Sequence, residues 1–307
     1  TLKGVGMTME GSENNPVMFE LLSELPWRPQ RFDKDQWLKE YTVARYGKSN
    51  PTVQDAWILL SNSSDNCPDA NTQQGTHESV FCARPTEHPY QVSSWSEMKD
   101  YYDPNDVIRA AAMMVSASDQ FKGNNNFEYD LVDIVRQAIA EKGRLTEKVV
   151  EAAFAAGDKK LYKAASDRFL RLILLQDELL ATRPEFKVGT WIARARSLGN
   201  TSEEKDLYEW NARVQITTWG NRLAADEGGL RDYAHREWNG ILKDFYYMRW
   251  KTWFDYQTRL LNGTKAAAID FYAIEEPWTK ATNVYPSEPE GDCIPTVKRI
   301  FVEIFGK

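Results

Sequence analysis

Apolar side chains recur at steps of three and four residues along most of this chain, the spacing that places them on one face of a helix. The pattern is nearly continuous from residue 129 to residue 180, and it returns in residues 201–218, in residues 230–253 and in a terminal amphipathic segment. The alternation of apolar and polar residues that is typical of a strand is nearly absent. The pattern therefore predicts an all-α fold, a multi-helix bundle or array.

Several of the expected helices carry start signals. Asp33 with Gln36 resembles a capping box, in which the Gln amide reaches back to the cap residue, and Thr201 with Glu204 resembles a second one. Asp103 stands directly before a proline, which is also a favoured way to begin a helix.

Two stretches interrupt the helical pattern. Residues 27–32 are a Pro- and Arg-rich connector, and we divide the chain there into a segment 1–31 and a helical domain 32–307. Residues 61–96 are polar and without periodicity, and a connection of this length is either functional or mobile. Its side chains that could reach a ligand are His77, Arg84, His88, Tyr90 and Trp95. Taken singly, each of them is interpreted as part of a surface excursion.

Composition narrows the function classes. Hydrophobic residues make up 42% of the 307 residues and charged residues 27%, which is typical of a folded globular protein. The net charge of −7 provides no basic face, so nucleic acid is not expected as a partner. No apolar run approaches the length of a membrane span. Eleven tryptophans and fourteen tyrosines are more than a core needs, and flat aromatic rings with a polar tip suit sugar rings.

No metal site or cofactor is expected. Cys67, Cys82 and Cys293 match no zinc spacing, and a Cys67–Cys82 disulfide and free thiols remain equally open. The three histidines are far apart in sequence, and His235, on an aromatic stretch, is interpreted as a packing or hydrogen-bonded residue. There is no phosphate-binding loop, dinucleotide fingerprint or nucleophile elbow.

One carboxylate near the start of the chain stands out. Glu10 lies in a loop with flanking glycines, directly before an apolar helical pattern. From the pattern alone, a solvated residue and a catalytic residue both remain open. Glycoside hydrolysis uses two carboxyl groups, one to protonate the leaving oxygen and one to attack the anomeric carbon or activate water. Nothing else in this chain stands out as the second.

The order of several motifs along the chain is similar to that of a known family. Taken together these motifs span essentially all 307 residues. They are Gly6-Met-Thr-Met-Glu-Gly11, Glu24-Leu-Pro-Trp27, Ala44-Arg-Tyr-Gly47, Ala56-Trp-Ile-Leu-Leu60, Gly189-Thr-Trp191, Ile216-Thr-Thr-Trp-Gly220 and Leu230-Arg-Asp-Tyr-Ala234, with the long helix that begins near Tyr129. The chain resembles the C-terminal part of the α-N-acetylglucosaminidases, glycoside hydrolase family 89.

The resemblance implies an architecture and a reaction. Members have a small N-terminal domain, a (β/α)8 barrel that bears the active site and an all-helical C-terminal domain packed against the catalytic face. Residues 1–31 would be the end of the barrel, with residues 2–5 as a strand remnant, and 32–307 the helical domain. Glu10 would be the nucleophile of a retaining exo-glycosidase that removes terminal α-linked N-acetylglucosamine. Its acid/base partner, about 5 Å away in a retaining enzyme, would lie upstream of Thr1, so this chain alone would be inactive.

The resemblance also implies a sugar site and a setting. Trp219 and Tyr233 match positions where the helical domain reaches the cleft, and their alternative role is to lock two helices together. Asn15 would orient the nucleophile or bind a substrate hydroxyl, or else cap the next helix. The segment 221–229 is longer than the family pattern. Expected partners are a glycan that ends in α-N-acetylglucosamine and the missing domains of the same protein, in an extracytoplasmic location.

Two other function classes remain open. The chain could be an all-α glycan-binding or scaffolding module without catalysis. It could also be a self-contained α/α-toroid enzyme of another sugar-active family, although no acid/base pair within its helices supports that. The aglycone and the oligomeric state are left open by the sequence.

Overall fold

The computed structural model describes residues 3–7, 16–68, 78–89, 92–93 and 101–306. It is 67% helical and has no strand among these residues, so the predicted all-α class is confirmed. The α-helices are α1 (Pro16–Glu24), α2 (Lys34–Tyr46), α3 (Pro51–Asn62), α4 (Pro104–Ala117), α5 (Asn125–Ala155), α6 (Lys159–Leu180), α7 (Val188–Ser197), α8 (Ser202–Gln215), α9 (Tyr247–Leu261), α10 (Phe271–Thr279) and α11 (Cys293–Phe305). The short helices are η1 (Leu25–Trp27), η2 (Val80–Cys82), η3 (Ser118–Phe121), η4 (Pro184–Phe186), and the π-helical turns η5 (Leu223–Glu227) and η6 (Leu242–Tyr246).

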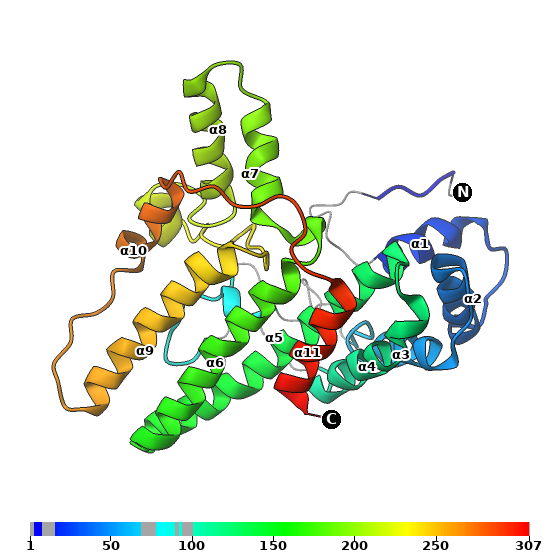
Figure 1. Cartoon of the computed structure of the whole chain (residues 1–307), viewed down its shortest axis with the longest axis horizontal. Helices are drawn as coiled ribbons and strands as arrows, with labels where there is room; N and C mark the ends of the chain where they lie inside the picture. Colours follow the sequence, from blue (N-terminus) through cyan, green and yellow to red (C-terminus); the bar gives the residue numbers. More distant parts are fainter. Residues whose placement is uncertain (1–2, 8–15, 69–77, 90–91, 94–100, 307) are drawn as a thin grey trace.

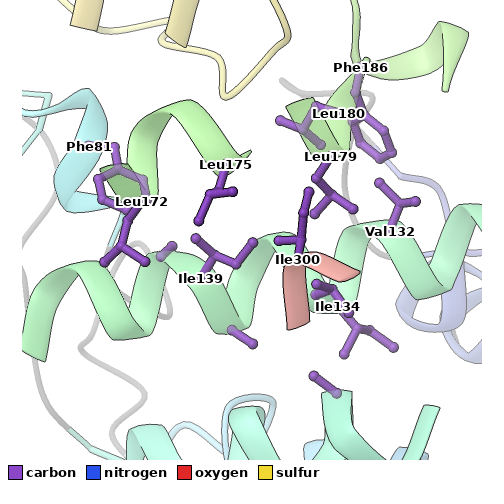
Figure 2. Close-up of a cluster of buried hydrophobic side chains, with 14 of the residues drawn as sticks. Phe81, Val132, Ile134, Ile139, Leu172, Leu175, Leu179, Leu180, Phe186 and Ile300 are labelled. Carbon is purple, nitrogen blue, oxygen red and sulfur yellow. The ribbon is translucent and has the colours of Figure 1, made fainter. Parts of the chain in front are cut away.

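The core lies along the hairpin of α5 and α6, with α4, α9 and α11 packed around it (Figure 1). Most of the apolar residues predicted for α5 and α6 face this core, with the exceptions of Val149 and Leu161, which are exposed. The apolar residues of the terminal segment also face the core: Val297, Ile300, Phe301 and Ile304. Figure 2 shows Ile139 of α5, Leu172 and Leu175 of α6, Ile300 of α11 and Phe81 of η2 in one cluster. Segments far apart in the sequence therefore share a single core.

The predicted helix starts are largely confirmed. The carboxylate of Asp33 accepts hydrogen bonds from the backbone N–H groups of Asp35 and Gln36, at 2.9 and 3.1 Å. The Gln36 amide, however, does not reach back: it donates to Glu40 one turn further along. Thr201 and Glu204 form the complete reciprocal box. The predicted capping box at Asp33 is therefore wrong in the hydrogen bond from the Gln36 side chain back to the cap residue. Glu40, four residues further along the helix, offers this amide an equally good partner.

Part of the long polar connection enters the core, contrary to the surface interpretation. Val80, Phe81, Cys82 and Ala83 are fully buried, and their short helix η2 contacts α5 and η6. The Phe81 ring lies against Phe169 with centroids 5.3 Å apart. His88, by contrast, is exposed as expected. Four apolar residues in a row are too few to show a period, which is why the pattern hid them.

The aromatic stretch after residue 230 does not form one helix from its start, as its stripe predicts. Residues 231–240 are turns and irregular backbone, and helical structure begins at η6. Asp232 and Gly240 have φ angles of 58° and 95°, which a right-handed helix cannot contain. At Gly240 a Cβ atom would stand 2.7 Å from Tyr285 and Val188, so glycine fits both the backbone and the close packing there.

The hairpin of α7 and α8 projects from the rest of the molecule (Figure 1). Leu207 and Trp210 of its predicted apolar stripe are 54% and 43% exposed, whereas Val214 at its base is buried. The predicted helix is therefore present, and of these three apolar residues only Val214, near the core, is buried.

The remaining sequence expectations concern the first residues and the cysteines. Residues 3–7 form no strand, because a strand needs a neighbour to complete its hydrogen bonds. Cys67, Cys82 and Cys293 form no disulfide with one another. None of the described helices has the length and apolar character needed to cross a membrane.

Candidate functional site

Two of the predicted site residues, Trp219 and Tyr233, lie in contact. Trp219 follows α8 and Tyr233 precedes η6, yet their ring centroids are 5.1 Å apart and their planes meet at 67°. Trp219 is half-buried and Tyr233 is 37% exposed. The pair, which we call the aromatic corner, therefore packs edge to face and also presents ring surface to solvent.

The backbone of the aromatic corner is unusual. Among the described residues, Trp219 and Asp232 are the two non-glycine positions with positive φ, at 61° and 58°. The N–H of Asp232 donates to the carbonyl of Thr217 at 2.7 Å, and the N–H of Trp219 donates to Val214 at 2.8 Å. Left-handed backbone at such residues costs about 1–3 kcal/mol each and gathers at functional sites. Its occurrence at both segments of the aromatic corner supports a functional role for this part of the chain.

A set of fully or partly buried charges lies behind the aromatic corner. The Arg249 guanidinium contacts the carboxylate of Asp232 at 2.9 Å and that of Glu275 at 2.8 Å. Arg84 also contacts Glu275, at 2.7 Å, and contacts Asp226 at 2.6 Å. The side chains of Asp232, Arg249 and Glu275 are fully buried. We call these five residues the buried ion cluster.

The electrostatics of the cluster follow from burial and pairing. Burial raises the pKa of the Asp232 carboxyl, and the neighbouring Arg249 acts in the opposite direction. Burial disfavours the charge of Arg249, but Asp232 and Glu275 together hold its pKa above the ordinary value. The cluster thus keeps its arginine charged inside the protein.

Arg231, next to Asp232, is a third arginine near the cluster. Its Nε atom, like that of Arg249, is buried without a hydrogen-bond partner, although the Nε of Arg249 pairs with Glu275 at 2.8 Å. Burial, followed by the charge of Arg84, lowers the pKa of Arg231. Three arginines therefore lie close together behind the aromatic corner, and Arg84 and Arg249 take up the acidic partners.

The other predicted residues are distributed as follows. Glu10 and Asn15 lie outside the described residues, as do His77, Tyr90 and Trp95, so their roles stay predictions. Arg84 belongs to the buried ion cluster. His88 lies beside Glu151 at 3.2 Å, on the outer part of α5.

His235 is hydrogen-bonded, as the sequence indicates. Its Nδ1 lies 3.0 Å from the carbonyl oxygen of Asp232 and 3.8 Å from Glu78. It also borders a pocket of about 160 Å³ between α5 and residues 235–238. No group of three or more His, Cys, Asp or Glu side chains in the described ranges is arranged to hold a metal ion.

Sequence reasoning missed the buried ion cluster. A signal was present: Asp232 lies in the Leu230-Arg-Asp-Tyr motif, and Arg249 interrupts an aromatic run between Tyr246 and Trp250. A charge on the inner face of an aromatic helix needs a buried partner. The sequence pattern does not indicate which acidic residue that partner is.

The arrangement favours binding over proton transfer in this part of the chain. Asp232 and Glu237, the carboxylates nearest in sequence to Tyr233, are both bound to arginines. The exposed aromatic surface beside them can stack on the apolar face of a sugar ring.

The chain is similar in sequence and in structure to several known proteins. Residues 37–303 match the Alpha-N-acetylglucosaminidase (NAGLU) C-terminal domain family. The human α-N-acetylglucosaminidase is 29% identical over 316 residues, which cover 99% of this chain and 40% of that protein. A family 89 glycoside hydrolase from Clostridium perfringens, solved with 2-acetamido-1,2-dideoxynojirmycin, is 34% identical with a TM-score of 0.90, covering 95% of this chain and 34% of that one. A doubly Glu→Gln-substituted form of the Clostridium protein, in complex with its substrate GlcNAc-α-1,4-galactose, matches at the same identity and TM-score.

Proposed function

Because this chain belongs to the family of α-N-acetylglucosaminidase C-terminal domains, we propose that it is the C-terminal part of a retaining exo-glycosidase. The parent enzyme would hydrolyse terminal, non-reducing, α-linked N-acetylglucosamine from glycans, in an extracytoplasmic location. The chain spans 40% of the human relative and about a third of the bacterial one. The activity therefore belongs to the longer parent protein.

The proposed division of labour follows the chemistry. Glu10, in the segment 1–31 that we assign to the end of the barrel, attacks the anomeric carbon as the nucleophile. A second glutamate, in the preceding part of the parent, protonates the leaving oxygen and then deprotonates the water that releases the sugar. Two substituted glutamates in the substrate complex of the Clostridium protein support a pair of glutamates. Asn15 orients the nucleophile or binds a hydroxyl group.

The helical domain, residues 32–307, contributes the aromatic corner. The exposed surface of Trp219 and Tyr233 stacks on the apolar face of the N-acetylglucosamine ring, and the Tyr233 hydroxyl offers a hydrogen bond. The observation that carries this role is their edge-to-face contact at 5.1 Å, next to Asp232, whose buried carboxylate is paired with Arg249. A binding wall held in this way needs no rearrangement when the sugar arrives.

The nucleophile is tested in the parent enzyme with an aryl α-N-acetylglucosaminide as substrate. Glu10→Ala should abolish turnover, and azide should partly restore it by acting as a small external nucleophile. The isolated 307-residue chain should show no hydrolysis, because one of the two carboxyl groups is elsewhere. Full activity of the Glu10→Ala enzyme would refute the nucleophile, and efficient hydrolysis by the isolated chain would refute the division.

A second candidate is a glycan-binding module without catalysis. The exposed aromatic corner favours it, since Asp232 and Glu237, the carboxylates closest to Tyr233 in sequence, are engaged with arginines. In that case the isolated chain binds N-acetylglucosamine measurably and loses this affinity in the Trp219→Ala variant, while the parent protein shows no hydrolysis. Turnover by the parent protein decides in favour of the glycosidase.

A further inference from the structure

The position of Asp232 connects the aromatic corner to the buried ion cluster. Its backbone N–H binds the carbonyl of Thr217, two residues before Trp219, and it directly precedes Tyr233. Its carboxylate accepts from Arg249 at 2.9 Å, and neither side chain is exposed. One residue is thus bonded to both segments that carry the aromatic rings and to the interior.

We infer that Asp232 is the positioning residue for the aromatic corner, and that Arg249 and Glu275 clamp it. The inference rests on the proposed function, because it assigns to Asp232 the orientation of the rings that bind the sugar. Asp232 does not touch the sugar itself, since its side chain is fully buried. It positions the backbone of residues 217–219 through its hydrogen bond to Thr217, and it sets the direction in which the side chain of Tyr233 points from the backbone.

The geometry of the clamp supports orientation as its task. Arg249 reaches Asp232 from α9, Glu275 reaches Arg249 from α10, and Arg84 reaches Glu275 from the segment after η2. Arg249 also donates to the carbonyl of Cys82 at 3.1 Å and lies over the Phe245 ring, 4.4 Å from its centroid. Arg249 therefore connects the Asp232 carboxylate to α10 and to the segment of η2.

Stability alone explains such a cluster poorly. Buried ion pairs are often no more stabilising than well-packed apolar residues of similar volume, while they fix one arrangement of the groups that they join. Asp232 also tolerates the left-handed backbone that its φ of 58° requires better than an apolar residue would. The combination of left-handed backbone and buried charge is what turns the chain so that Tyr233 meets Trp219.

The test uses the parent enzyme and an aryl α-N-acetylglucosaminide. Asp232→Asn keeps the side-chain shape and the tolerance for positive φ, but it removes the charge that Arg249 binds. The matched control is Asp130→Asn, because Asp130 is also a buried carboxylate, bound by Arg45 at 2.9 Å, and it lies on α5 away from Asp232 in the sequence. Both variants lose a buried ion pair, and thermal unfolding measures that shared loss.

The two variants should differ in kinetics. Asp232→Asn is expected to raise KM about tenfold while kcat changes much less, because a displaced aromatic wall weakens binding of substrate and transition state alike. Asp130→Asn should lower the unfolding temperature and leave KM unchanged. Glu275→Gln, which loosens the clamp without touching Asp232, should raise KM by a smaller factor, and it decides the matter if Asp232→Asn does not fold.

Three results overturn the inference. The KM values of Asp232→Asn and Glu275→Gln could equal that of the parent enzyme despite a loss of stability, which would make the cluster purely structural. A fall in kcat without a change in KM would assign Asp232 to the reaction step instead of the binding wall. A parent protein without any hydrolysis would refute the proposed function itself, and the positioning role with it.

Discussion

Gly143, in the middle of α5, offers a direct test of how η2 packs into the core. A Cβ atom at this position would stand 2.4 Å from Cε1 and 2.5 Å from Cζ of Phe81. The Phe81 ring is fully buried and packs against Phe169. The backbone carbonyl of Phe81 also accepts a hydrogen bond from Trp250 at 3.1 Å. The ring is therefore fixed on several sides.

The expected effect of Gly143→Ala is the difference of two opposing terms. Alanine in a helix interior is favoured over glycine by about 0.5–1 kcal/mol. Against this, the Phe81 ring would have to recede by about 1 Å to restore ordinary contact, and overpacking of a core costs about 1–3 kcal/mol. We expect the overpacking to win, because the ring and the backbone of Phe81 are both held, and predict a net loss of about 1–2 kcal/mol.

The assay is urea unfolding of the chain, followed by circular dichroism, in a double-mutant cycle with Phe81→Leu. Phe81→Leu removes the ring edge that the new methyl group would meet. In that background Gly143→Ala should be neutral or stabilising by up to about 1 kcal/mol, the helix term alone. Equal effects of Gly143→Ala in both backgrounds would refute the argument, and so would a gain of stability in the otherwise unchanged chain.

Two further predictions concern single charged groups. Burial, then the neighbouring Glu151, raises the pKa of Glu147 from 4.5 to about 8, so the stability linked to this group is complete below pH 4.5 and is lost as the pH rises to about 8. Glu147→Gln should therefore flatten the dependence of the unfolding temperature on pH between those values. An unchanged slope would refute the pKa shift. The second prediction is that Arg231→Met raises the free energy of unfolding by about 1 kcal/mol. The Nε atom of Arg231 is buried without a hydrogen-bond partner, and removing an unsatisfied buried donor removes its desolvation cost. A lower free energy of unfolding, measured with urea, would show that the guanidinium is needed.

Helix ends were predictable because their determinants are local. The cap at Asp33 and the complete box of Thr201 with Glu204 involve partners no more than three residues away, so the pattern of the sequence contains everything that is needed. The same holds for the core-facing stripes of α5 and α6. Where two local partners compete, as for the Gln36 amide, the pattern cannot choose between them.

Interactions between distant segments were not predictable in the same way. The irregular backbone before η6 depends on Gly240, whose environment is formed by Val188 and Tyr285 from other segments. The pairing of Arg84 with Glu275 joins residues 191 positions apart. A stripe of aromatic residues indicates that a segment is buried. It does not indicate which residues of that segment have left-handed backbone or which distant carboxylate pairs with its arginine.

In the candidate site, too, the residues in local motifs were predictable and those that depend on distant contacts were not. Trp219 and Tyr233 were identified from residues 216–220 and 230–234, whose motifs place them in a family, and the structure brings the two rings together. Their role in sugar binding stays a prediction, as do those of Glu10 and Asn15. The buried ion cluster behind them was found only when the chain was seen folded, because its members are scattered from Arg84 to Glu275.

The segment 221–229, which the resemblance predicts to be longer than the family pattern, does not separate the two rings, and the reason lies in how its ends are held. The bond from Asp232 to Thr217 closes the base of the excursion at 2.7 Å. Within it, the π-helical turn η5 takes up the length, Ala225 is buried as an anchor, and Asp226 is tied to Arg84. Because the entropic cost of a closed loop grows only slowly with its length, additional residues can be accommodated between two fixed ends. The contact of Trp219 with Tyr233 therefore depends on the clamp at Asp232, and not on the number of residues that separate the two rings.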